Sequence, residues 1–108
     1  MFKISNKVRR LSDEEKLQYK NDGYITSLPV FSEEAKYDLD NFFVSLSTSI
    51  DKELDLNKTA QWHKASKKFY NLCSTPVILD YVEDLLGPNF FLWGGQFFLK
   101  EPKDGSVV

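Results

Sequence analysis

The sequence feature that most constrains the fold is the aromatic run Phe90–Lys100, FFLWGGQFFLK, which is bounded by Pro88 and Pro102. Its aromatic and apolar residues favour a β-strand, and proline at both borders is typical of strand ends. Side chains alternate between the two faces of a strand, and here both faces are largely apolar. The run therefore predicts a strand that is covered on both sides.

Two polar side chains of this run, Gln96 and Lys100, fall on the same face of the predicted strand. If the strand is covered on both sides, they lie in a lined interior and need polar groups opposite them, because burying an amide or an ammonium without partners is costly. Alternatively, Gln96 pairs with neighbouring backbone, and Lys100 extends its ammonium to solvent at the strand end. The run by itself leaves both interpretations open.

The composition excludes several classes of protein. A chain of 108 residues makes at most one small domain, and a hydrophobic fraction of 42% is enough for its core. A net charge of −2 argues against nucleic-acid or membrane partners, and no apolar run approaches a membrane span. The single cysteine, Cys73, offers no disulfide framework, and the basic start lacks the apolar run of a secretory signal. We therefore expect a cytoplasmic protein.

Two helices are predicted in the first half of the chain. Ser12 and Glu15 form a capping box, and the helix that follows them ends at Gly23, a residue suited to a left-handed cap. Ser32 caps the second helix, whose apolar residues keep a helical period as far as Ile50. This second helix has the most regular pattern in the chain.

Two further helices are predicted in the second half. Apolar residues share one helical stripe over Lys64–Cys73, and a helix that starts at Pro76 ends at Gly87. Short strands are predicted at Tyr24–Leu28 and Lys58–His63. Because the helices come first and the strongest strand comes last, the order of elements predicts an α+β fold.

The domain organisation is predicted to be a flexible arm, residues 1–10, followed by a single domain over residues 11–108. The turn signal Asp104-Gly105 is typical of a hairpin, yet only the short segment Ser106–Val108 follows it. An isolated hairpin is marginally stable in water, so the aromatic strand would have too few partners. We therefore expect the sequence to be the beginning of a longer domain.

Five segments, in this order, carry a family resemblance: LSDEEKLQYKNDGYI, SEEAKYDLDNF, QWH, STPVILDYVEDLLGPN and WGGQFFLKEPKDGSVV. Over roughly residues 11–108 the chain resembles the amino-terminal part of the phytanoyl-CoA dioxygenase family. The resemblance implies an Fe(II)- and 2-oxoglutarate-dependent oxygenase that hydroxylates a small organic substrate. It also implies a double-stranded β-helix, a jelly-roll-like barrel, of which this chain would form the helical cap and the first strands.

The resemblance implies that the iron ligands, a His-x-Asp and a later histidine, follow Val108, as does an arginine that binds 2-oxoglutarate. Such iron sites need two histidines and a carboxylate on one face of the metal. This chain has one histidine, His63. We therefore expect the chain to have no catalytic residue of its own, and to bind neither iron nor 2-oxoglutarate stably.

Four residues of this chain are candidates for the pocket. The resemblance implies that Lys58 pairs with a carboxylate of 2-oxoglutarate as a point charge and that Gln96 adds a contact; otherwise Lys58 is an ordinary exposed lysine. His63, in QWH, falls where relatives often have a histidine lining the substrate pocket. Alternatively, it bonds to backbone near a strand end. Trp62 contacts substrate or, alternatively, belongs to the core.

A protein of a different class would explain the same open aromatic strand. In this alternative, the 108 residues are a complete, non-catalytic binding or subunit module that self-associates through an unfinished sheet edge. The two interpretations predict different native masses, because the module would purify as a stable dimer of chains that end at Val108.

Overall fold

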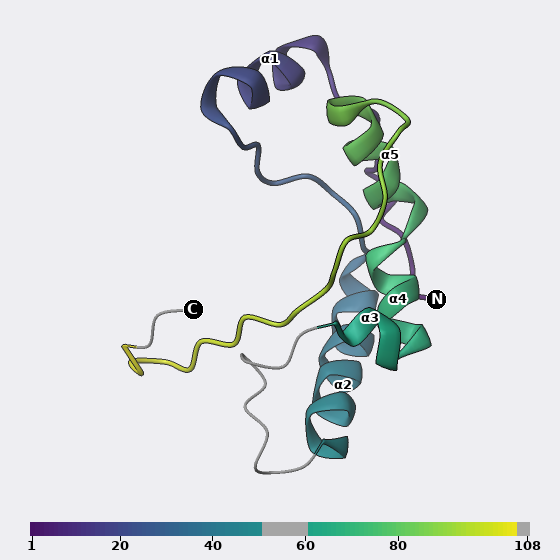
Figure 1. Ribbon diagram of the computed structural model, residues 1–108, viewed down its shortest axis with the longest axis vertical. Helices are drawn as coiled ribbons and strands as arrows, with labels where there is room; N and C mark the ends of the chain where they lie inside the picture. The colour runs from purple at the N-terminus through teal and green to yellow at the C-terminus, as the bar shows by residue number, and fades with distance from the viewer. Residues whose placement is uncertain (51–60, 106–108) are drawn as a thin grey trace.

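The computed structural model describes residues 1–50 and 61–105, whose arrangement is shown in Figure 1. The regular elements of these residues are helices: α1 (Asp13–Asp22), α2 (Glu33–Ser49), α3 (Trp62–Ala65), α4 (Lys67–Cys73) and α5 (Pro76–Leu86). Helices α1 and α5 lie at one end of the molecule, and α2, α3 and α4 lie toward the other (Figure 1). The described part of the chain is thus mostly helical.

The predicted α+β fold, with the first strands of a double-stranded β-helix, is wrong. The described residues contain no strand ladder, and their one bridge with both partners described, Ile4 with Phe31, is isolated. The run Phe90–Lys100 follows α5 as a drawn-out connection that leads away from the helices toward the C-terminal end (Figure 1). Aromatic residues favour strands only where neighbouring strands pack beside them. Here Phe97 and Leu99 pack against the helical core, whereas Phe91, Trp93 and Phe98 are exposed.

Neither of the two shorter predicted strands forms a strand in the described residues. Tyr24–Leu28 is not a strand, and within it Ser27 has a φ of 63°, a left-handed conformation that interrupts an extended backbone. In Lys58–His63, residues 58–60 lie outside the described residues, while Trp62 and His63 belong to helix α3.

The first predicted helix, α1, is confirmed together with both of its caps. The Ser12 hydroxyl accepts the Glu15 N–H at 3.1 Å, and the Glu15 carboxylate accepts the Ser12 N–H at 3.0 Å. Gly23 has a φ of 82° and donates its N–H to the Tyr19 carbonyl at 2.8 Å. No residue of α1 is buried, so this helix depends on its caps and on its connection to α5.

The other predicted helices are confirmed, with one difference. Ser32 caps α2 as predicted, and α5 runs from Pro76 to its cap at Gly87. The predicted stripe Lys64–Cys73 is divided between α3 and α4, because the extended backbone of Ser66 separates them. The Ser66 hydroxyl caps α4, so a serine that looks like an ordinary helix residue starts a new helix.

Residues 1–10, for which the sequence predicts a flexible arm, pair with the segment that leads into α2. Ser5 donates its N–H to the Val30 carbonyl at 2.9 Å, and Ser32 donates its N–H to the Lys3 carbonyl at 2.9 Å. The arm therefore forms two backbone hydrogen bonds with this segment.

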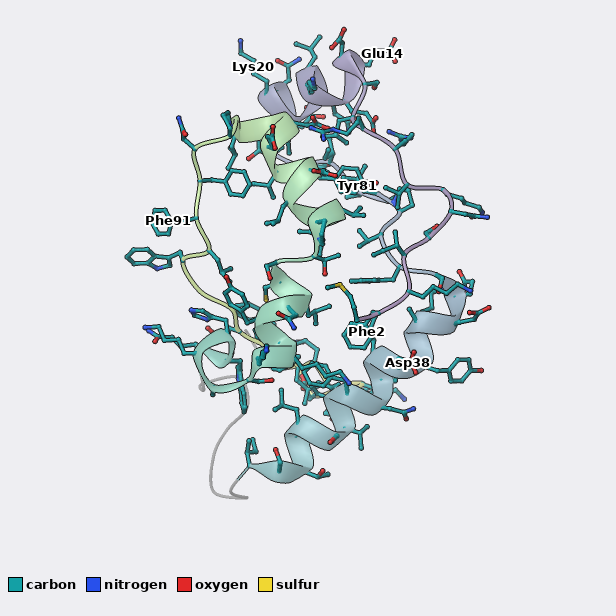
Figure 2. The ribbon with its side chains drawn as sticks, turned by 90° about the vertical axis from the view of Figure 1, so that its right-hand side faces the viewer. Phe2, Glu14, Lys20, Asp38, Tyr81 and Phe91 are labelled. Carbon is teal, nitrogen blue, oxygen red and sulfur yellow. The ribbon has the colours of Figure 1, made fainter. Side chains whose placement is uncertain are left out.

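The core gathers apolar side chains from distant parts of the chain. Its buried members come from the arm, α2, α3 and α4: Phe2, Ala35, Phe42, Trp62 and Phe69. Figure 2 shows Phe2 directed between α2 and the helices opposite, and 7% of this residue is exposed. Phe97, from the aromatic run, adds its ring 5.1 Å from Phe69 and 5.2 Å from Phe43, between ring centroids. The aromatic run is thus anchored in the core at this position.

The arm also connects to α5 through charged groups. Arg10 donates to the two Asp84 carboxylate oxygens, with Nη2 at 2.5 Å and Nε at 3.1 Å from Oδ1, and the Leu11 N–H donates to the same carboxylate at 3.0 Å. These donors hold the pKa of Asp84 below its usual value. Arg9 meanwhile pairs with Glu15 of α1 at 2.6 Å, so charged pairs link both helices to the arm.

None of the described helices combines the length and the apolar character that crossing a lipid bilayer requires.

Candidate functional site

The most distinctive hollow in the described residues is an open groove of about 470 Å³ along the aromatic run. We call it the aromatic groove. It is lined by residues of this run and by one residue that precedes α3: Gln61, Phe91, Leu92, Trp93, Gly94, Gly95, Gln96 and Phe98. The rings of Phe91 and Trp93 are 6.0 Å apart, and the two residues are 76% and 86% exposed. Figure 2 shows Phe91 pointing away from the helices.

Two hydrogen bonds attach the aromatic run to helix α3, and both involve Gly95. Trp62 donates its N–H to the Gly95 carbonyl at 3.2 Å, and Gly95 donates its own N–H to Nδ1 of His63 at 3.2 Å. The two bonds join one residue to two consecutive residues, so they fix both the position and the direction of the run. The QWH segment and the aromatic run, which are far apart in sequence, therefore meet at this point.

Gly95 lies so close to α4 that no other residue fits there without a shift. A Cβ at this position would be 2.4 Å from Cε1 of Phe69 and 3.3 Å from Sγ of Cys73. Burial raises the pKa of the Cys73 thiol, so the thiol stays protonated and packs as a small apolar group.

The bond from Gly95 determines which ring nitrogen of His63 holds the proton. An imidazole nitrogen that accepts a hydrogen bond has no proton of its own, so His63 must be neutral with its proton on Nε2. His63 is half-buried, and the described residues provide no carboxylate that pairs with it. The histidine thus accepts a backbone N–H, but from a position in helix α3 and not near a strand end as the second interpretation had it.

Trp62 is a core residue in this structure. It is 6% exposed, its ring centroid lies 6.0 Å from that of Phe97, and it does not line the aromatic groove. Its indole Nε1–H is buried with no hydrogen-bond partner among the described residues. Such a donor carries a desolvation cost of about 1–3 kcal/mol.

The other polar residues singled out from the sequence differ in where they lie. Gln96 is exposed and lines the aromatic groove, and Lys100 is exposed and lies 3.6 Å from Asp104. The interpretation that buries both side chains in a lined interior is therefore wrong. Lys58 lies outside the described residues.

The described residues do not fit an iron centre. They contain no group of three or more histidine, cysteine, aspartate or glutamate side chains placed to hold a metal ion. The single histidine already uses Nδ1 to accept the Gly95 N–H. Comparison with known protein families, with curated proteins and with solved structures finds no match.

The attachment at Gly95 is the part of the site that the sequence interpretation missed. One signal for it exists, because a glycine inside an otherwise strand-like run indicates a close approach of another part of the chain. That signal does not say what approaches. Trp62 and His63 could be identified as the partners only once the structure placed α3 beside the run.

Proposed function

We propose that this chain is the amino-terminal part of an Fe(II)- and 2-oxoglutarate-dependent oxygenase that hydroxylates a small organic substrate, similar to the phytanoyl-CoA dioxygenase family. The order and spacing of the five resembling segments support the proposal. One geometric observation supports it as well: the QWH segment and the aromatic run are joined at Gly95, so His63 stands beside the groove that Gln96 lines.

The proposal assigns the described residues to the wall of the pocket rather than to the metal. The donor set around His63 does not fit iron, so the iron ligands would come from other parts of the protein. Bound iron and 2-oxoglutarate would supply the oxygen chemistry. The groove residues would shape the space for the substrate, and Lys58 would pair with a carboxylate of 2-oxoglutarate.

The coding sequence after Val108 gives the most direct test. It should encode a His-x-Asp shortly after Val108, and later a histidine and an arginine. The protein expressed from that frame should form succinate from 2-oxoglutarate when Fe(II) and a substrate are present. A frame without these residues would contradict the proposal.

In that same protein, Lys58→Ala should raise the 2-oxoglutarate requirement strongly. Loss of a charge-assisted hydrogen bond costs about 1–3 kcal/mol, which corresponds to roughly a 5- to 150-fold change in affinity. Lys103→Ala is the matched control, because Lys103 lies in an exposed turn and should have almost no effect. Equal 2-oxoglutarate dependence in the two variants would remove Lys58 from the assignment.

A second candidate function is a subunit module that pairs with a second copy of itself. The backbone groups of Phe90, Leu92 and Gly94 have no hydrogen-bond partner among the described residues, and Phe91 and Trp93 are largely exposed. No charged residue occurs between Phe90 and Leu99, so two copies can pair along this segment without facing like charges. Lys100 is within 3.6 Å of Asp104, which balances the charge at the border.

Light scattering over a range of protein concentrations tests this second candidate. A self-associating chain should show a mass that rises toward a dimer, and Trp93→Lys should weaken the dimer by about thirtyfold or more. Tyr37→Lys is the control, because Tyr37 is 78% exposed on α2 and lies outside the segment. A monomeric mass at every concentration, or equal effects of both substitutions, would exclude dimerisation through this segment.

A further inference from the structure

The hydrogen bond from Gly95 to His63 can form in only one protonation state of the histidine. Nδ1 accepts the Gly95 N–H at 3.2 Å, which requires a neutral ring. When the ring takes up a second proton, Nδ1 becomes a donor and its N–H faces the N–H of Gly95. The attraction at this position then becomes a repulsion.

The groups around His63 offer no compensation for that added proton. Lys64 follows it on α3, Lys67 begins α4, and the aromatic run has no charge between Phe90 and Leu99. Cys73, on the α4 side of Gly95, has a protonated thiol. The described residues place no carboxylate against the imidazole.

The Gly95 attachment divides the aromatic run into two parts. On its carboxyl side, Phe97 is anchored in the core by ring contacts with Phe69 and Phe43. On its amino side, the described residues give Phe90, Leu92 and Gly94 no hydrogen-bond partner before α5 is reached. The attachment is therefore what holds the first half of the aromatic groove.

From these observations, we infer that His63 is a proton-controlled latch that holds the wall of the aromatic groove. With a neutral ring, Gly95 is fixed against α4 and the groove keeps its shape. With a protonated ring, the Gly95 N–H loses its acceptor, so the Trp62 N–H bond to the Gly95 carbonyl is left to hold this point and Phe90–Gly94 is loosened, while Phe97 stays anchored. The latch does not depend on the proposed oxygenase function, since it rests only on the contacts at Gly95.

The first test is nuclear magnetic resonance of the full chain, titrated roughly from pH 8 to pH 5, where histidine changes its charge. The ring nitrogens should show the Nε2–H tautomer at the alkaline end. The protection of the Gly95 amide against exchange, corrected for the intrinsic rate, should fall by about tenfold as the ring is protonated. The Gly23 amide, bonded to the Tyr19 carbonyl at 2.8 Å, is the internal control and should not change.

The matched variant is His63→Asn, whose side-chain oxygen can accept the Gly95 N–H at every pH of the titration. Its Gly95 amide should be protected throughout, without the pH dependence. An Nδ1–H tautomer in the native chain would overturn the latch. The same conclusion would follow if Gly95 protection did not change while His63 titrated, or if His63→Asn kept the pH dependence.

A second measurement uses Cys73, the only cysteine of the chain, which lies beneath Gly95. Its alkylation rate, divided by the rate of the unfolded chain at the same pH, reports how well the run covers it. This ratio should rise about tenfold on protonation of His63 and stay constant in His63→Asn. A ratio that is equally constant in both proteins would contradict loosening of the run.

Discussion

Among the glycines of the chain, Gly95 has the least space for a side chain. A Cβ there would lie 2.4 Å from Cε1 of Phe69, whose ring is buried in the core and cannot shift without disturbing its neighbours. Gly94, one residue earlier, has ordinary space, because the nearest atom to its Cβ position is Cε1 of His63 at 4.0 Å. Two adjacent glycines therefore differ in what they contribute to the structure.

This difference gives a prediction for two single substitutions. Gly95→Ala should lower the free energy of unfolding by about 2 kcal/mol, because the added methyl group overpacks the contact with Phe69. Gly94→Ala, the matched control, should change it by less than about 0.5 kcal/mol. Urea denaturation of the three proteins measures both values. Equal destabilisation by the two substitutions would mean that the close approach of the run to α4 is not maintained in solution.

At the scale of elements, the sequence predicts helices well because their signals are local. The capping box at Ser12 and the proline at position 76 act on neighbouring residues, and both mark helix starts in the structure. The aromatic run was predicted as a strand because its residue types favour that state. A strand also needs partners at its edges, and residue types do not specify those partners. Gly95 and His63 illustrate the same limit, since their contact spans 32 positions.

The connection between the arm and the helices should make the fold sensitive to acid. Arg9 lowers the pKa of Glu15 to about 2, and Arg10 holds that of Asp84 below its usual value. A carboxylate whose pKa is lower in the folded state stabilises the fold at pH values above its unfolded pKa, about 4. That contribution is lost as the pH falls through the folded pKa. The melting temperature should therefore decrease roughly between pH 5 and pH 2.

Asp84→Asn should make that decrease smaller, because the substitution removes one of the carboxylates with a lowered pKa. Asp80→Asn is the control: Asp80 lies 3.4 Å from Arg10 but is half exposed, whereas the Asp84 side chain is 9% exposed. Thermal unfolding followed by circular dichroism at several pH values compares the three proteins. If Asp84→Asn lost as much stability in acid as the native chain does, the bond to Arg10 would not be responsible.

For the whole molecule, the residue inventory limits the metal chemistry available to this chain alone. A mononuclear iron site of the oxygenase type needs two histidines and a carboxylate, and the chain has one histidine. We expect well below one iron per chain after anaerobic addition of Fe(II), removal of excess metal and elemental analysis. His63→Asn should retain the same amount as the native chain. A stoichiometric iron that is lost in this variant would contradict the ligand count.

The composition of the core has a consequence for the way the chain folds as it is synthesised. Phe2 is synthesised well before the residues that it packs with: its ring lies beside Phe42, and the cluster around them also includes Trp62, Phe69 and Phe97. Closing contacts between such distant positions is entropically costly and slow. The helices can form during synthesis, but the aromatic cluster is complete only after Phe97 has been added. In that interval the apolar rings of the cluster are available to neighbouring nascent chains, which favours aggregation during synthesis.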